Sequence, residues 1–447
     1  MKERIDLLKG NILSTLTKLA IPIMGTSLIQ MAYNMTDMIW IGRVGSKALA
    51  AVGTAGMFMW LSQGLITLCR IGGQVKVGQS LGANDINLAK DYTKTAIQMG
   101  AILALLYTLV MIVFSKPLIG FFNFSEIDVI NDARIYLIYI SIGLVFTFLN
   151  QIITGLITAT GNSKTPFLVN SVGLVVNIIL DPILIFGIGI IPSLGVIGAA
   201  IATVLAQGIV FSLYVHYMRN ENLIFVDLNV FSKIKTKLVN DIVKIGLPPG
   251  VQSAMFTIIA IIIARIIADF GSSAIAVQKV GSQIESMSWM TADGFASALN
   301  SFISQNYGAN NNERAKEGYY TSIKISIILG LFTTSLLVFL PGPIFYIFLP
   351  EKGLLPLGID YLRILGYSQL FMCTEIVTSG AFAAFGRTTV PSIINVVFTA
   401  IRIPMAIVLI KLFGGLNGIW WALTISSVIR GILLPSMFVY FLKKNNI

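Results

Sequence analysis

Long, almost uncharged runs of apolar residues recur along the whole chain and limit what it can fold into. Four of them cover residues 98–115, 134–160, 171–213 and 322–350. Each run suits one or two helical spans of about 20 residues through the hydrocarbon core of a bilayer. Only 11% of the residues are charged, whereas soluble proteins average about 25%. We therefore predict an all-α membrane protein with many transmembrane helices.

The apolar runs divide into twelve predicted spans. The longest polar stretch between them, residues 219–240, is predicted to be a cytoplasmic linker. It would separate an N-terminal six-helix lobe, residues 1–218, from a C-terminal six-helix lobe, residues 241–447. The predicted spans are 13–40, 48–78, 90–114, 132–158, 165–187, 195–218, 241–268, 274–304, 316–341, 358–384, 390–412 and 416–441.

Lysine and arginine are divided unequally between the two sides of the predicted membrane. Nineteen lie on the side that holds both termini and eight on the other. Because positive residues favour the cytoplasmic side, we expect both termini in the cytoplasm and a multi-pass protein of a bacterial-type cell (inner) membrane. The segment Met1–Gly10 has no small-residue cleavage site of a signal peptide. The net charge of +11 reflects this topology and suits an anionic lipid surface, so nucleic-acid binding is not expected.

The two halves of the chain repeat one another in register. With six spans in each half, both halves enter the membrane in the same direction, which predicts a pseudo-twofold axis along the membrane normal and a central cleft between two bundles. Matching residues recur at offsets of 220 to 226 positions, among them Pro22 as Pro248, Gly45 as Gly271, Asn84 as Asn310, Gly161 as Gly386 and Gly198 as Gly418.

The repeat fails at four polar positions, all of them in the first half. An ionisable residue inside a span is costly in lipid and is functional by default. Two carboxylates, an amide and a hydroxyl form a set of hard oxygen ligands suited to Na⁺; alternatively, two carboxylates that share a site hold a proton. We predict a cation-binding, coupling site here, which is a metal site only if Na⁺ is the coupling ion. The four positions and their counterparts are Asp37 (Ile263), Asn177 (Arg402), Asp181 (Ala406) and Thr203 (Leu423).

Helical spacing groups further polar residues with these four. Side chains three, four or seven positions apart share a helix face. Pro182 also has no N–H, so the carbonyl of Ile178 lacks its helical partner and is a spare oxygen ligand. The four additional candidates on this basis are Gln30, Asn34, Asn170 and Gln207.

The second half has intramembrane acids of its own, Glu285, Asp293 and Glu375. Two alternatives stay open for them: pairing with intramembrane arginines, or binding of a cationic substrate. Trp289, and Tyr33 in the first half, belong to stripes of Met and aromatic residues that are usually packing but also suit apolar ligands. The arginines available for pairing are Arg265, Arg402 and Arg430.

The chain lacks the motifs of an enzyme or an ATPase. No Gly-x4-Gly-Lys-Ser/Thr loop or His-Glu-x2-His sequence occurs, and the one Gly-x-Ser-x-Gly match, Gly78-Gln-Ser-Leu-Gly82, ends an apolar span instead of following a strand. We expect no enzymatic activity and no cofactor, with H⁺ or Na⁺ as the coupling ion. Cys69 and Cys373 lie in apolar spans and are predicted to be buried small hydrophobic residues.

An ordered set of motifs resembles the multidrug and toxic compound extrusion (MATE) transporters over essentially the whole chain. The resemblance implies a V-shaped pair of six-helix lobes that export organic cations and other drugs in exchange for Na⁺ or H⁺. It also implies that Asp37, Asn177, Asp181 and Thr203 form the N-lobe cation site of the DinF-like and archaeal type. The motifs are Ile41-Gly-Arg-Val-Gly45 after Asp37, Gly78-Gln-Ser-Leu-Gly-Ala-Asn84, Gly161-Asn-Ser-Lys-Thr-Pro166, Asn177-Ile-Ile-Leu-Asp-Pro182 and Gly195-Val-Ile-Gly-Ala-Ala-Ile-Ala-Thr203.

One feature departs from the NorM-type members, which carry an acid midway along the seventh span. Residues 245–268 contain no acid, only Gln252, so a C-lobe Na⁺ site of that kind is not expected. Glu375 lies near the acidic position of the tenth span without being clearly in register with it.

We predict a secondary active multidrug exporter that works by alternating access, as a monomer in the lipid bilayer, with small organic cations or drugs as substrates. The alternative is a flippase for a lipid-linked precursor, as in related superfamilies. Its pyrophosphate substrate would require a cleft lined by cations. The arginines that favour this alternative are Arg70, Arg265 and Arg402.

Overall fold

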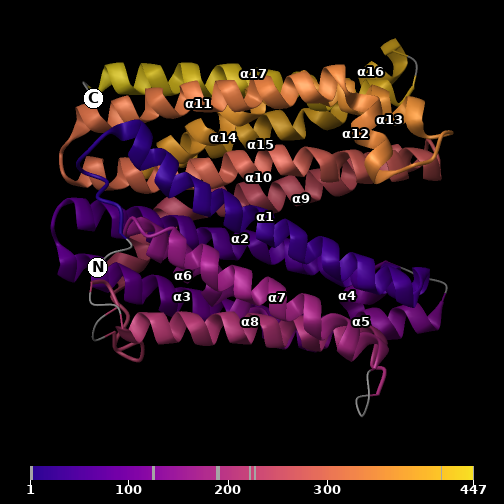
Figure 1. Ribbon diagram of the computed structural model, residues 1–447, viewed down its shortest axis with the longest axis horizontal. Coiled ribbons are helices and arrows are strands. Elements are labelled where there is room, and N and C mark those ends of the chain that lie inside the picture. The colour runs from indigo at the N-terminus through magenta and orange to yellow at the C-terminus, as the bar shows by residue number, and fades with distance from the viewer. Residues whose placement is uncertain are drawn as a thin grey trace. The chain divides into compact units, whose positions relative to one another are not determined.

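The computed structural model (Figure 1) describes residues 4–122, 126–187, 192–220, 223–225, 228–413 and 415–445. Across these residues the chain forms α-helices joined by turns and loops, with no strand. Residues 221, 222, 226 and 227 of the predicted linker lie outside the described part. Helices satisfy their backbone hydrogen bonds internally, which lipid demands. The all-α prediction is confirmed.

Each predicted span coincides with one helix or with two consecutive helices. The helices are α1 (Ile12–Val44), α2 (Ser46–Gly82), α3 (Ile86–Val113), α4 (Ser115–Gly120), α5 (Ile127–Ile142), α6 (Leu144–Ala159), α7 (Lys164–Phe186), α8 (Gly195–Asn220), α9 (Thr236–Ala268), α10 (Ser272–Gly308), α11 (Asn312–Phe339), α12 (Pro341–Phe348), α13 (Leu355–Gly366), α14 (Gln369–Ala384), α15 (Thr389–Ala400), α16 (Arg402–Phe413) and α17 (Asn417–Lys444).

By length and composition alone, nine helices of the described chain can cross a membrane. One of them, Thr389–Phe413, joins α15 and α16. The pair α5 and α6, bent by 47°, makes a tenth if it counts as one span. The two remaining predicted spans are α10, which carries many Ser, Asn and Gln residues, and the broken pair α13 and α14.

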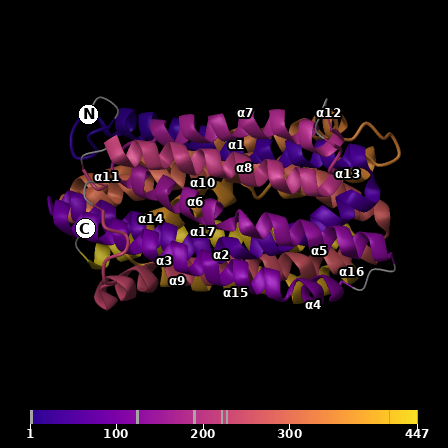
Figure 2. The same ribbon diagram turned by 90° about the horizontal axis from the view of Figure 1, so that it is seen from below.

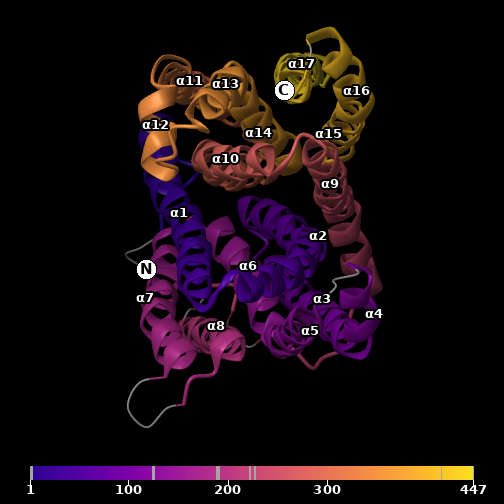
Figure 3. The same cartoon turned by 90° about the vertical axis from the view of Figure 1, so that its right-hand side faces the viewer.

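The described chain separates into two compact units. Unit 1 is Met1–Ile5 with Gly25–Gly250, and unit 2 is Asp6–Met24 with Val251–Ile447. Within unit 1, α2 packs on α3, α5 and α6, and α7 packs on α8 (Figure 2). Within unit 2, α14 packs on α10, α11 and α17, and α16 packs on α17 (Figure 3). The boundary between the units falls after Met24 in α1 and after Gly250 in α9. These two positions are 226 residues apart, which is the offset of the repeat.

Helix boundaries follow the repeat. Both ends of α2 and α3 recur 226 positions later as the ends of α10 and α11, and α6 recurs as α14 at 225. Asn84 and Asn310, which close the equivalent turns, share a left-handed φ of 57°, a conformation that Asn tolerates better than most residues. The repeat seen in the sequence is therefore a repeat of structure.

Apolar side chains on the outer faces of the helices match a lipid environment. Three such side chains on α3 are Leu105, Leu109 and Val113, which are 59%, 59% and 61% exposed. They are four positions apart and so form one stripe along the helix. Exposed apolar stripes of this kind, rare on soluble proteins, are what contact with lipid tails requires.

A close contact between α2 and the first half of α9 depends on glycine. A Cβ at Gly246 would lie 1.9 Å from the carbonyl oxygen of Leu68, and one at Gly72 would lie 2.4 Å from that of Ile242. A Cβ at Gly250 would likewise lie 2.7 Å from the carbonyl oxygen of Gly64. Small residues at this spacing let two helix backbones approach closely in a membrane.

We expect Gly246→Leu to prevent this approach and to lower both the yield of folded protein and its apparent unfolding temperature in detergent. Overpacking of this kind costs about 1–3 kcal/mol or more. Gly53→Leu on α2 is the matched control, since nothing lies within 4 Å of a Cβ there. Equal behaviour of the two variants in a thermal unfolding assay would rule out the packing argument.

Candidate functional site

The four polar residues at which the repeat fails lie on three helices of unit 1. Asp37 lies near the end of α1, in the part that belongs to unit 1. Asn177 and Asp181 lie four positions apart on α7, which continues through Pro182, so they share one face. Thr203 lies on α8, which packs along α7.

Asp181 is the centre of the group. The Nδ2 atom of Asn177 donates a hydrogen bond to Oδ1 of Asp181 over 3.2 Å, and both residues are fully buried, at 0% and 1% exposure. The side chain of Asp37 interacts with those of Asp181 and Asn177. Two carboxyl groups from different helices therefore share one buried site.

Each of the four residues keeps one buried side-chain oxygen with no hydrogen-bond partner. Each such atom costs about 1–3 kcal/mol when left unpaired, and of the twenty in the described chain these four belong to one group of neighbouring residues. The four oxygens are available as ligands for a small cation, and the two carboxylate oxygens among them as acceptors for a proton, without competition from other donors. The atoms are Asp37 Oδ1, Asn177 Oδ1, Asp181 Oδ2 and Thr203 Oγ1.

Two buried tyrosines complete the surroundings of this site. The hydroxyl of Tyr33 donates to the backbone carbonyl oxygen of Thr203 over 3.4 Å, and Tyr33 interacts with both aspartates. Tyr136 on α5 interacts with the same two aspartates. Tyr33 lies one helical turn before Asp37, a spacing that indicates this role; nothing in the sequence pattern singles out Tyr136.

The four additional candidates in the first half have surroundings of their own. Gln30 and Asn34 are exposed. Asn170 donates to the hydroxyl of Tyr214 over 2.9 Å, and the side-chain oxygen of Gln207 accepts a hydrogen bond from Asn150 over 2.9 Å. In the described part of the chain, no hydrogen bond or ion pair joins any of them to Asp37 or Asp181. Their share in the site is a prediction from spacing alone.

In unit 2 three of the four equivalent positions belong to an apolar core. Ile263 and Ala406 are buried in it, and Leu423 packs against the same cluster. Arg402, the counterpart of Asn177, donates to the hydroxyls of Ser426 over 2.6 Å and Ser427 over 3.0 Å. The asymmetry of the sequence therefore corresponds to one polar site and one apolar core.

Two of the three intramembrane acids named for unit 2 have partners of their own. Glu375 accepts a hydrogen bond from Arg430 over 2.9 Å within a buried ion pair, as the pairing alternative predicted. Glu285 instead accepts hydrogen bonds from Tyr361 and Gln369, each over 2.9 Å.

Three other residues named from the sequence lie outside these pairs. Arg265 pairs with Asp269 on the surface. Asp293 is exposed and Trp289 is half-buried. Substrate binding by Asp293 or Trp289 stays a prediction.

Comparison with known proteins gives consistent matches over nearly the whole chain. A sequence model of the MatE family matches residues 22–183 and 248–408. The "Probable multidrug resistance protein NorM" of Thermotoga maritima is 28% identical over 438 residues, which are 95% of this chain and 91% of that protein. The "FAD transporter" of Shewanella oneidensis is 25% identical over 439 residues, 97% of this chain and 95% of that protein.

A solved structure, the "Crystal structure of MATE in complex with MaL6", has the same fold. Its TM-score is 0.91, with 23% sequence identity, covering 99% of this chain and 100% of that chain. The predicted fold class, two related bundles of transmembrane helices, is thereby confirmed.

Proposed function

Because the chain belongs to the MatE family of transporters, we propose that it is a secondary active multidrug exporter that exchanges its substrate for H⁺ or Na⁺. Its relative from Thermotoga maritima is named as a probable multidrug resistance protein, which supports drugs as the substrate class. The proposed location is a bacterial cell membrane, with both termini in the cytoplasm.

The observation that carries the antiport proposal is the group of unpaired buried oxygens on Asp37, Asn177, Asp181 and Thr203. A coupling ion that binds there neutralises part of the charge of the two carboxylates, and its departure restores that charge. This change of charge in a buried site is large enough to favour different conformations of the transporter, since an uncompensated carboxylate is costly in a low-dielectric medium. Binding of the ion on one side of the membrane and release on the other would drive export.

The flippase alternative finds less support. It needs a cleft lined by unpaired cations, whereas Arg265 is paired with Asp269. Arg402 lies near Glu285 and Glu375. Of the three arginines that favoured it, only Arg70 has a buried Nε without a partner.

The experiment is efflux of a cationic dye from proteoliposomes under a Na⁺ gradient and a pH gradient imposed separately. We expect efflux well above that of protein-free vesicles under one gradient, which identifies the coupling ion. FAD, the substrate named for the Shewanella relative, and a polyprenyl pyrophosphate lipid serve as competing substrates. Dye efflux that is unaffected by either gradient contradicts antiport, and lipid translocation without dye efflux favours the flippase.

A further inference from the structure

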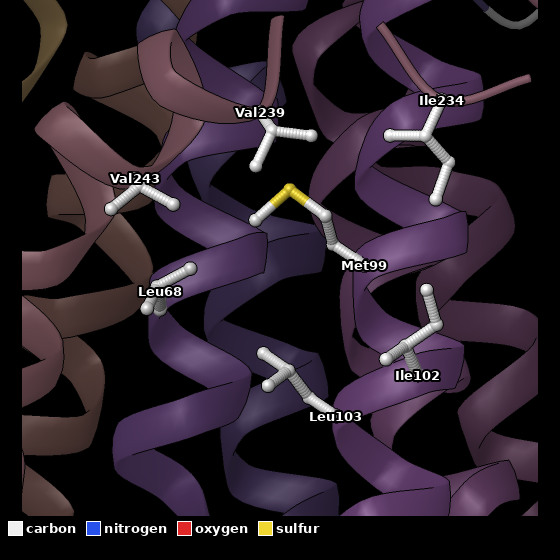
Figure 4. A pocket seen from close by; sticks show the side chains of 7 residues that line it. All are labelled: Leu68, Met99, Ile102, Leu103, Ile234, Val239 and Val243. Carbon is white, nitrogen blue, oxygen red and sulfur yellow. The ribbon is translucent and has the colours of Figure 1, made fainter. Parts of the chain in front are cut away.

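A groove lined by apolar side chains lies on unit 1, at the place where α2 and α3 meet the linker and the start of α9. Figure 4 shows the thioether of Met99 in the middle of it, facing Val239 and Val243. The volume is about 350 Å³, within the range of about 300–1,000 Å³ of ligand pockets. The lining residues are Leu68, Met99, Ile102, Leu103, Ile234, Val239 and Val243.

The wall that the linker contributes is held in place. Gln98 on α3 donates hydrogen bonds to the carbonyl oxygens of Val230 over 2.6 Å and Ser232 over 2.8 Å. Ile224 and Phe225 are buried in the core of unit 1. Ile234, which follows this anchored segment, is therefore positioned over the groove by the fold of unit 1.

Positive charge gathers at one end of the groove. Lys94 and Lys235 both form ion pairs with the single carboxylate of Asp91, and Lys233 next to Ile234 is exposed. These four residues carry three positive charges and one negative charge. Asp91 precedes the lining residues Met99 and Leu103 on α3 by 8 and 12 positions, which corresponds to about 12–18 Å along the helix.

We propose that this groove binds one acyl chain of an anionic phospholipid, whose phosphate contacts the lysines at its end. A chain that spans the bilayer exposes such a groove to lipid, and a flexible methionine adapts to a mobile alkyl chain. The lysines lie at one end of the groove and the apolar lining extends away from them along α3. A phospholipid has the same arrangement, with a charged headgroup at one end and an apolar tail beyond it. Near a membrane surface each lysine contributes appreciably to attraction for anionic headgroups, which favours phosphatidylglycerol over phosphatidylcholine.

The test is titration of the purified, detergent-solubilised protein with phosphatidylglycerol or with phosphatidylcholine of identical chains, read by native mass spectrometry. We expect the wild type to bind phosphatidylglycerol about tenfold more tightly or better. In Lys233→Gln/Lys235→Gln this preference should be lost. Val239→Phe, which fills the groove, should weaken binding of both lipids. Lys352→Gln/Lys411→Gln, which removes two exposed lysines of unit 2, is the charge-matched control and should bind like the wild type.

Any of the following outcomes would overturn the proposal: equal binding of both lipids by the wild type, an equal loss in the control variant, full competition by inorganic phosphate, or full binding by Val239→Phe. Stoichiometric displacement of the lipid by the cationic dye would instead assign the groove to transported substrate and would equally overturn it. The assay measures lipid binding without transport, so its outcome is independent of the proposed antiport.

Discussion

Asp37→Asn and Asp181→Asn are each expected to reduce dye efflux to the level of protein-free vesicles while the protein stays folded. Asparagine keeps the size of the side chain and an oxygen ligand. It carries no charge, so it neither exchanges a proton nor compensates a bound cation. Because the two carboxyl groups interact, they act as a unit. Dye efflux by the double variant should therefore be no lower than dye efflux by either single variant.

Stability provides a second measurement for the same variants. Removing one of two interacting buried carboxylates relieves charge repulsion and desolvation, so the unfolding temperature should be unchanged or higher. This combination of lost transport and retained stability separates a functional role from a structural one. Ile39→Val is the control on α1, because Ile39 is exposed and is not a candidate for the site, so this variant should transport normally. Near-normal efflux by either aspartate variant would refute the proposed coupling site.

Arg430→Met is expected to give the largest loss of stability, about 3–5 kcal/mol. Arg430 and Glu375 are only 7% and 5% exposed, and their nitrogen and oxygen atoms are 2.9 Å apart. Removal of the guanidinium leaves a buried carboxylate whose Oε2 atom already lacks a hydrogen-bond partner. The effect is therefore dominated by the cost of an uncompensated charge.

The double variant Arg430→Met/Glu375→Gln should recover most of that loss, because no charge is then left unpaired. Arg265→Met is the control, since the pair of Arg265 with Asp269 is exposed and such pairs contribute about 0–1 kcal/mol. The unfolding temperature in detergent is measured for the wild type, Arg430→Met, Arg430→Met/Glu375→Gln and Arg265→Met. If Arg430→Met unfolds at the temperature of Arg265→Met, the buried pair has no structural role.

The sequence was sufficient to locate the long helices and the repeat, but not the short helices α4 and α12 or the breaks within three of the predicted spans. Apolar runs of membrane-spanning length and the offset of 226 positions are local or periodic signals, and the boundaries of α2, α3, α10 and α11 follow them. Two aspartates in lipid-length spans were also recognisable, because the cost of a charge in hydrocarbon depends only on its surroundings being apolar.

Tertiary structure decided which polar residues meet. Helical spacing assigns a side chain to a face but does not say which helix lies opposite that face. Asn170 and Gln207 share faces with Asn177 and Thr203, yet Tyr214 and Asn150 are their partners. Tyr136 on α5 interacts with the two aspartates. It is too far from both of them in the sequence for helical spacing to have predicted this. The choice between Arg265, Arg402 and Arg430 as partner of Glu375 likewise depends on packing, because hydrogen bonds form only between groups that the folded helices bring within about 3 Å of each other.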